Sequence, residues 1–133
     1  MSNGEIIVLS DVALITCIVQ KGMADGLIKA AQEAGAQGAT VYYARGVGVR
    51  ERLGVVGFAI EVEKEVITIV VSTDQLDRVF ERMYAAGRLA TPGMGIIYAT
   101  TLDKAATYVP HEIVEKHAKP VTRTAAAAGG GGE

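Results

Sequence analysis

The chain has 133 residues, a length typical of one domain, so we expect no separate catalytic and substrate-binding domains. Half of the residues are apolar, only 5% are aromatic and Trp is absent, which predicts a core of Ile, Val, Leu and Ala. The net charge of −2 and the dispersed basic residues argue against nucleic acid as a partner. A domain this small and apolar has more hydrophobic side chains than its interior can hold. We therefore expect some of them to be buried between the subunits of an oligomer.

The N-terminus lacks the basic and apolar stretches of a targeting segment, and no apolar run approaches the roughly 20 residues that span a bilayer. Cys17 is the single cysteine and lies in an apolar run, so we expect a buried core thiol rather than a nucleophile or metal ligand. These features together predict a cytoplasmic protein.

The first half of the chain contains a strand, a helix and a second strand. Residues 5–10 are compatible with a short extra strand, and the nearly continuous apolar run 13–20 predicts a buried central strand. A helix is expected over residues 23–34, ended by Gly35 in a left-handed turn. Residues 39–44 are rich in β-branched and aromatic side chains and predict the second strand.

The next elements begin with a loop over residues 45–63, which holds four glycines and mixed charge. Residues 65–72 predict a third strand. Thr73 and Asp74 offer capping side chains for a second helix, whose apolar residues recur at helical spacing until Gly87 ends it.

A fourth strand over residues 96–100 follows the loop 88–95, which contains Thr-Pro-Gly. Segments 15–46 and 67–101 repeat the order strand, helix, glycine-bearing turn, strand. This repeat predicts an α+β fold of the ferredoxin-like type, a split βαββαβ antiparallel sheet with both helices on one face. The other apolar face then needs cover, for which self-association is the natural source.

The expected domain covers residues 12–110, between an N-terminal arm of residues 1–11 and a C-terminal tail of residues 111–133. A short helix is compatible with residues 111–117. The Ala- and Gly-rich segment 125–133 is of low complexity, and we expect it to be disordered.

Positive evidence for catalysis is absent. His111 and His117 have no accompanying Cys or carboxylate cluster, so surface histidines explain them better than a metal site. The glutamates of the loop 45–63 alternate with basic residues, and no Ser lies near a His. By contrast, Gly46-Val-Gly48 and Gly93-Met-Gly95 both lie at the ends of predicted strands. Each turn has two interpretations: its backbone N–H groups bind an anion, or its glycines only permit a tight turn.

Several stretches between residues 13 and 108 resemble the PII nitrogen-regulatory signal-transduction family. They are Gly38-Ala-Thr40-Val, Arg45-Gly46-Val-Gly48, Lys64 before Val66-Ile-Thr-Ile-Val-Val, and Ala86-Gly87-Arg88 with Gly93-Met-Gly95. The resemblance implies a non-enzymatic homotrimer that binds ATP, ADP and often 2-oxoglutarate in clefts between subunits. It also implies that the loop after the second strand, the T-loop, contacts target proteins and reorders with the ligand.

Carried over to this chain, the resemblance places Thr40 on the adenine or ribose side, Lys64 near an anionic group, and residues 49–63 in the T-loop. The cleft at the T-loop base would be lined by Gly46, Val47 and Gly48, and the phosphate-side B-loop of the adjoining subunit would comprise Gly87, Arg88, Gly93, Met94 and Gly95. The partner-binding residues of the T-loop would be Arg50, Glu51, Arg52, Leu53, Val55 and Phe58. The apolar stretch 53–58 either docks to a partner protein or continues the third strand and packs on a neighbouring subunit. The partner that we expect from the resemblance is a membrane transporter.

Departures from the family pattern predict a divergent, PII-like member. The T-loop is shorter and lacks the tyrosine that many members uridylylate. Ile96, Thr107 and Val109 stand where the family has cations. Each lost charge-assisted hydrogen bond removes roughly 1.5–3 kcal/mol, which disfavours tight ATP binding. We therefore expect an adenine nucleotide (ATP, ADP or AMP) or another small anion as effector and no metal. The alternatives are a CutA-like metal-binding trimer and a small ferredoxin-like isomerase.

Overall fold

The computed structural model of the protein describes residues 6–47, 62–108 and 118–121. They fall into two compact units. One takes its described residues from Met1–Val12 and Thr101–Glu133, and the other is Ala13–Thr100. No helix within the described segments is long and apolar enough to cross a membrane.

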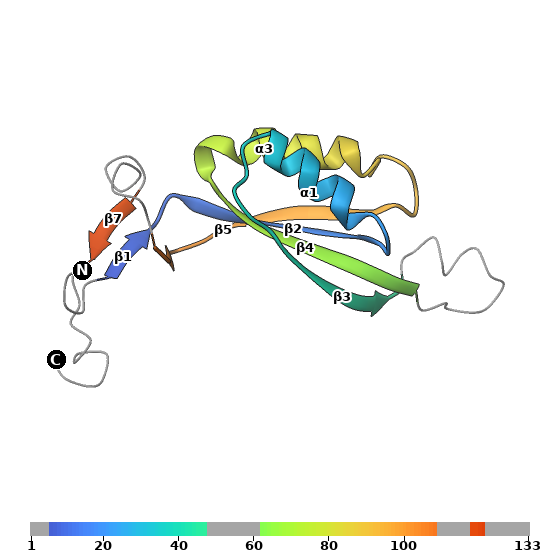
Figure 1. The fold of residues 1–133 in the computed structure, drawn as a ribbon, viewed down its shortest axis with the longest axis horizontal. Coiled ribbons are helices and arrows are strands. Elements are labelled where there is room, and N and C mark those ends of the chain that lie inside the picture. Colours follow the sequence, from blue (N-terminus) through green and yellow to red (C-terminus); the bar gives the residue numbers. More distant parts are fainter. Residues whose placement is uncertain (1–5, 48–61, 109–117, 122–133) are drawn as a thin grey trace. The chain divides into compact units, whose positions relative to one another are not determined.

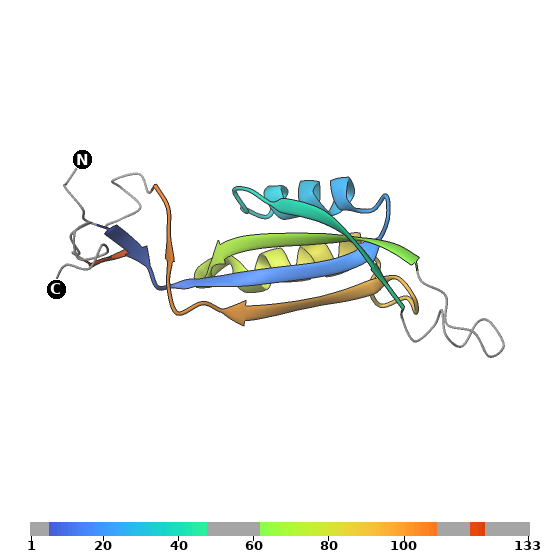
Figure 2. The same ribbon diagram turned by 90° about the horizontal axis from the view of Figure 1, so that it is seen from below.

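The larger unit is built on a four-stranded sheet with the strand order β3-β4-β2-β5. Its strands are β2 (Val12–Gln20), β3 (Thr40–Gly46), β4 (Val62–Ser72) and β5 (Gly95–Thr101), and its helices are α1 (Ala24–Glu33) and α3 (Thr73–Ala86). Both helices lie on one face of this sheet (Figures 1 and 2). The predicted α+β fold with a split βαββαβ order is confirmed.

Strands β3 and β4 extend further than the sequence predicts. They pair antiparallel from Thr40 opposite Thr68 to Gly46 opposite Val62. The charged and glycine-bearing ends were expected to belong to a loop over residues 45–63. They are strand because the pairing register continues through them.

The core lies between the sheet and the two helices. Alternate residues of β2 and β4 point toward the helices, as expected of strands with one covered face. Alanines line the sheet-facing side of α1, which lets this helix approach closely. The buried cluster comprises Ile15, Cys17, Val19, Ala24, Leu27, Ala31, Ala34, Ala36, Ile67, Ile69, Val71, Val79 and Met83.

Helix α1 is fixed at both ends by contacts from other elements. The backbone N–H of Ala24 donates to Oε1 of Glu65 at 2.8 Å, and Nε of Arg78 donates to the carbonyl oxygen of Ala34 at 2.8 Å. Gly35 follows with φ +117°, which is the predicted left-handed termination. A Cβ at Gly35 would lie 3.0 Å from Nε2 of Gln75, so the glycine also permits the close approach of α3.

Helix α3 ends as predicted but begins differently. Its C-cap is Gly87, whereas its N-cap is Ser72, whose side chain makes no capping hydrogen bond. Thr73 and Asp74 lie in the first turn instead of preceding it. The N-cap position expected for these two side chains was therefore wrong, because the helix starts one residue earlier than a Thr73 cap requires and two residues earlier than an Asp74 cap requires.

The face of the sheet without helices is rich in exposed apolar side chains. Residues on β3, β4 and β5 that alternate with the core residues point to this face, and several of them are exposed. They are Tyr42, Val70, Ile96 and Tyr98. This helix-free face is the uncovered apolar surface expected from the sequence.

The smaller unit is a three-stranded sheet with the order β6-β1-β7. Strand β1 (Ile6–Leu9) is the expected extra strand, and it pairs antiparallel with both β6 (Ala105–Ala106) and β7 (Ala118–Val121). Strand β7 was not expected, since the sequence after residue 110 was assigned to a tail. The helix considered for residues 111–117 lies outside the described residues.

Candidate functional site

One end of the four-stranded sheet gathers the glycine turns singled out in the sequence. The end of β3 lies beside the start of β4, since Gly46 is opposite Val62. The start of β5 lies beside the end of β2, because a Cβ at Gly95 would fall 2.3 Å from the carbonyl oxygen of Ile18. An ion pair from Lys21 reaches the start of β4. The base of the predicted T-loop and the predicted B-loop therefore share this end, which we call the functional end.

The B-loop is attached to the functional end through a side chain of β2. Nε2 of Gln20 donates to the carbonyl oxygen of Gly93 at 2.9 Å. Gly93 and Gly95 have φ values of +84° and +142°, which glycine adopts without strain. Backbone geometry therefore accounts for both glycines of the Gly93-Met94-Gly95 turn.

Much of the B-loop's own N–H capacity is used within the loop. The N–H groups of Arg88 and Leu89 donate to the last turn of α3, while those of Thr91 and Met94 donate to carbonyl oxygens of the loop at 2.9 and 3.2 Å. Arg88 adopts φ 55°, which is uncommon for a residue with a side chain. An anion at this loop therefore depends on side chains and on N–H groups outside these turns.

Gly87 has a packing role in the structure. The residue is buried, and a Cβ here would meet side-chain carbons of Leu27 at 3.2 Å and of Leu89 at 3.3 Å. The absence of a side chain is explained by the approach of the loop to α1.

Thr40 lies at the opposite end of β3 from Gly46 and Val47. Thr40 and Gly46 are the two ends of a seven-residue extended strand, six residue steps and about 20 Å apart. One chain therefore does not bring these predicted site residues together. Gly48 and the predicted T-loop residues Arg50, Glu51, Arg52, Leu53, Val55 and Phe58 lie outside the described residues.

At the functional end, the charged side chains of β3 and β4 lie on two different faces of the sheet. Lys64 is paired opposite Ala44 and points to the helix-free face, together with Val66 and Val70. Glu63 is paired opposite Arg45 and Glu65 opposite Tyr43, and these four residues belong to the helix-bearing face. The predicted ligand-binding lysine is thus on the same face as the exposed apolar residues.

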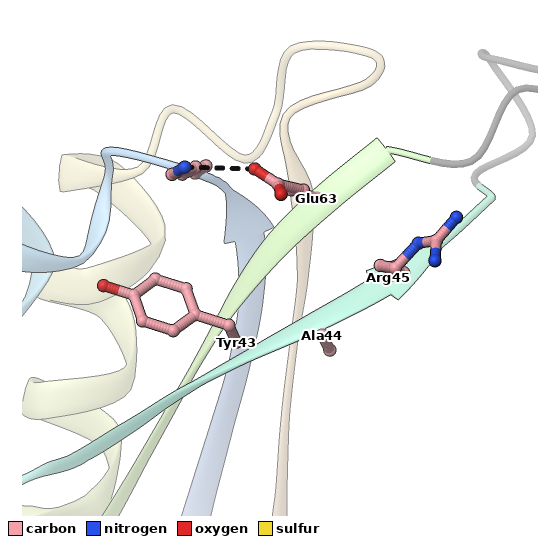
Figure 3. A pocket seen from close by; sticks show the side chains of 5 residues that line it. Tyr43, Ala44, Arg45 and Glu63 are labelled. Atoms are coloured by element: carbon pink, nitrogen blue, oxygen red, sulfur yellow. Dashed lines mark ion pairs between the residues drawn. The ribbon is translucent and has the colours of Figure 1, made fainter.

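A depression on the helix-bearing face was missed by the sequence analysis. It has a volume of about 590 Å³ and is lined by Lys21, Tyr43, Ala44, Arg45 and Glu63 (Figure 3). Nζ of Lys21 lies 3.1 Å from Oε1 of Glu63, and this hydrogen bond, with the charge of Glu63, raises the pKa of Lys21. The position of Lys21 just after the first strand and the alternation of Tyr43 with Arg45 were the available sequence signals.

The structure describes two of the three positions where the family has cations, and it confirms the expected burial of the cysteine. Ile96 and Thr107 are exposed, whereas Val109 lies outside the described residues. Cys17 is buried, and desolvation raises its pKa to about 11. No group of three metal-ligating side chains occurs in the described part of the chain, which does not include His111 or His117.

Comparison with known proteins identifies similar sequences and folds. The sequence pattern of the family described as "Nitrogen regulatory protein P-II" matches residues 12–112. No curated protein sequence matches the chain significantly. Among solved structures, PII of Arabidopsis thaliana bound to citrate is similar in fold, with a TM-score of 0.56 and 22% sequence identity. The similar region covers 71% of this chain and 79% of that one.

Proposed function

Because the chain belongs to the nitrogen regulatory protein P-II family, we propose that it is a homotrimeric regulator that binds a small anionic effector between subunits. In this proposal, a partner protein is regulated through the short T-loop, which the start of β4 at Val62 limits to residues 49–61. The family consists of signalling regulators rather than enzymes, and no catalytic group is assigned to this chain.

The observation that carries the proposal is the arrangement of the predicted effector residues around one strand. Gly46, Val47 and Lys64 lie at the functional end with Gly93–Gly95, while Thr40 lies about 20 Å away along β3. A single chain cannot use both ends of β3 for one small ligand. Two neighbouring copies can, if Thr40 of one copy approaches the functional end of the next, as expected of an intersubunit cleft.

The helix-free face supports the trimer. Tyr42, Val70, Ile96 and Tyr98 leave on it an apolar surface that is unusual for a monomeric protein in water. Packing three such faces around a common axis removes the apolar side chains from water. Because Lys64 points to the same face, this packing would place Lys64 close to the neighbouring subunit.

The effector we propose carries less negative charge than ATP. Lys64 and Arg88 are cationic residues of the predicted site, whereas Ile96 and Thr107 carry no charge where the family has cations. The solved PII of Arabidopsis thaliana holds citrate, which makes small carboxylates reasonable candidates beside ADP and AMP. A triphosphate would retain part of its charge without a protein partner, and we expect it to bind more weakly.

The proposed partner is a membrane transporter, and the proposed location of the complex is the cytoplasmic side of the membrane. The apolar sequence of residues 53–58 supports docking to a protein surface. Arg50, Glu51 and Arg52 would supply charged contacts at the edge of that surface.

A ligand screen by thermal shift, followed by calorimetry, tests the proposal. ATP, ADP, AMP, citrate, 2-oxoglutarate, bicarbonate and divalent metal ions are tested separately. We expect an adenine nucleotide or a carboxylate to raise Tm, since a ligand that binds only the folded protein at 100 times its Kd contributes about 2.7 kcal/mol. The Lys64→Gln variant should lose this shift, and the exposed Lys29→Gln variant on α1 should keep it. A response to divalent metals alone would instead support the CutA-like alternative.

A further inference from the structure

We infer that Gln20 is a positioning residue of the effector cleft, because its side-chain amide holds a turn of the B-loop by the carbonyl oxygen of Gly93. Gln20 is the last residue of β2, and it is not among the site residues that the resemblance to the family implies. The inference rests on the proposed function, in which the B-loop lies beside an anionic effector.

Residues 91–94 of the B-loop form a type II turn. The N–H of Met94 donates to the carbonyl oxygen of Thr91 at 3.2 Å, and Gly93 adopts φ +84° in the third position. Pro92 occupies the second position, where its fixed φ suits this type of turn. Because Gly93 has no Cβ, local sterics restrict the direction of its carbonyl group only weakly. A fixed direction of this carbonyl group therefore depends on a contact from outside the turn.

Gln20 supplies this contact from a fixed backbone. Its Nε2 donates to the carbonyl oxygen of Gly93 at 2.9 Å, between residues 73 positions apart in sequence. The carbonyl oxygen of Gln20 accepts the N–H of Met23 at 3.2 Å in a second turn, where Gly22 adopts φ +98°. This second turn joins β2 to α1 and lies at the same end of the larger unit as the B-loop (Figures 1 and 2). Gln20 therefore links the B-loop to a turn that is itself anchored on β2.

The two ends of the B-loop are attached independently of Gln20. At the start of the loop, the N–H of Leu89 donates to the carbonyl oxygen of Tyr84 at 3.1 Å, and the Leu89 side chain packs against the buried core cluster. At its end, Gly95 lies close to the backbone of Ile18, as its contact with the carbonyl oxygen shows. Loss of the Gln20 hydrogen bond should therefore loosen the middle of the loop and leave the fold intact.

The direction of the Gly93 carbonyl group is important for an anionic ligand. A carbonyl oxygen carries partial negative charge and repels an anion, whereas backbone N–H groups attract one. The hydrogen bond from Gln20 engages this oxygen at the end of β2, so the oxygen is not available to turn toward the effector. Without Gln20, binding would have to order the turn as well, which lowers the affinity.

The first test is amide hydrogen exchange of the ligand-free, full-length protein, measured by NMR. Gln20→Met keeps the length of the side chain without a donor, and it should speed exchange of the Met94 amide about three- to tenfold, the equivalent of one neutral hydrogen bond. Gln20→Lys supplies a donor of similar reach and should restore slow exchange. Gln32→Met makes the same change as Gln20→Met at an exposed position on α1, and it should leave the Met94 amide unchanged.

The second test measures affinity by calorimetry, with ADP and citrate as separate probes. For a probe that binds the unmodified protein, Gln20→Met should weaken binding about three- to tenfold, and Gln32→Met should leave it unchanged. Unchanged affinity or unchanged Met94 exchange in Gln20→Met would overturn the inference, as would a Gln20→Lys variant that exchanges as fast as Gln20→Met. If neither probe binds the unmodified protein, the proposed function fails instead, and the exchange comparison alone decides whether Gln20 holds the turn.

Discussion

Gly95 lies where β5 packs closely against the backbone of β2. It begins β5 with φ +142°, and a Cβ built on it would lie 2.3 Å from the carbonyl oxygen of Ile18. A backbone oxygen cannot move aside as a flexible side chain can. The glycine is therefore required by the packing of β5 on β2, whatever ligand the neighbouring loop binds.

Gly95→Ala should lower the free energy of unfolding by about 2–4 kcal/mol, because it adds backbone strain to a steric clash. Urea denaturation measures this change. Gly38→Ala is the matched control, since nothing lies within 4 Å of its Cβ position, and it should be neutral or stabilising by up to about 1 kcal/mol. Equal stability of the two variants would contradict the structure at β5.

Cys17 should be protected from thiol reagents in the folded protein. Burial raises its pKa from 9.0 to about 11, so the reactive thiolate is scarce as well as inaccessible. At pH 8, Ellman's reagent should label the native protein slowly and the guanidinium-denatured protein rapidly, with one equivalent per chain. Rapid labelling of native protein would contradict the burial of this residue.

The same pKa shift predicts the sign of a pH effect on stability. The folded-state pKa is raised, so the contribution of the neutral thiol is fully present below pH 9. As the pH rises from about 9 to 11, the unfolded chain loses its proton first, and this contribution is lost. Cys17→Ala should therefore show a smaller loss of stability over that range, measured by urea denaturation at each pH.

At the scale of elements, α1 depends on side chains from β4 and α3. Glu65 accepts the N–H of Ala24 at its start, and Arg78 donates to Ala34 at its end. Both partners are more than 40 residues away in sequence. Helix α1 is short, and a ten-residue helix has little stability alone, so these tertiary contacts are important for it.

Glu65→Ala should lower the free energy of unfolding by about 1–2 kcal/mol, because a buried N–H at the helix start loses its acceptor. Glu65→Gln keeps an oxygen there and should lose less. Glu81→Ala, at an exposed position on α3, serves as the control and should change stability by less than about 0.5 kcal/mol. The idea fails if the Glu65→Ala and Glu81→Ala variants unfold at the same urea concentration.

Elements were predictable from the sequence where local chemistry determines them. Gly35 ends α1 in the expected conformation because only a few neighbouring residues set that turn. The extension of β3 and β4 to Gly46 and Val62 depends on pairing between distant residues, so charge and glycine content were misleading there. Strand β7 depends likewise on pairing with β1, at the far end of the sequence.

The candidate site was predictable only in part, for a similar reason. The turns Gly46-Val47 and Gly93–Gly95 could be found because glycines at strand ends are visible in sequence. The depression lined by Lys21, Tyr43, Ala44, Arg45 and Glu63 joins residues of β3, β4 and the turn after β2. The position of Lys21 after a strand and the alternation of Tyr43 with Arg45 do not by themselves show that these residues meet. The place of Thr40 in an effector site depends on a second copy of the chain, which is a property of the assembly.

For the whole molecule, the helix-free face is the feature with the widest consequence. Tyr98 on this face and Tyr84 on α3 have nearly equal exposure, 45% and 44%. Tyr98→Glu should disrupt the proposed trimer, because it places a charge in an apolar interface. Tyr84→Glu should leave the assembly unchanged. Size-exclusion chromatography of the two variants at equal concentration provides the comparison, and equal elution volumes would argue against this interface.

The mass of the unmodified protein in solution, measured by light scattering after size exclusion, tests the central claim most directly. An intersubunit effector cleft predicts a mass three times the 13.9 kDa of one chain, maintained on dilution through the micromolar range. A mass equal to a single chain would contradict the account, because Thr40 and the functional end could then not belong to one ligand site.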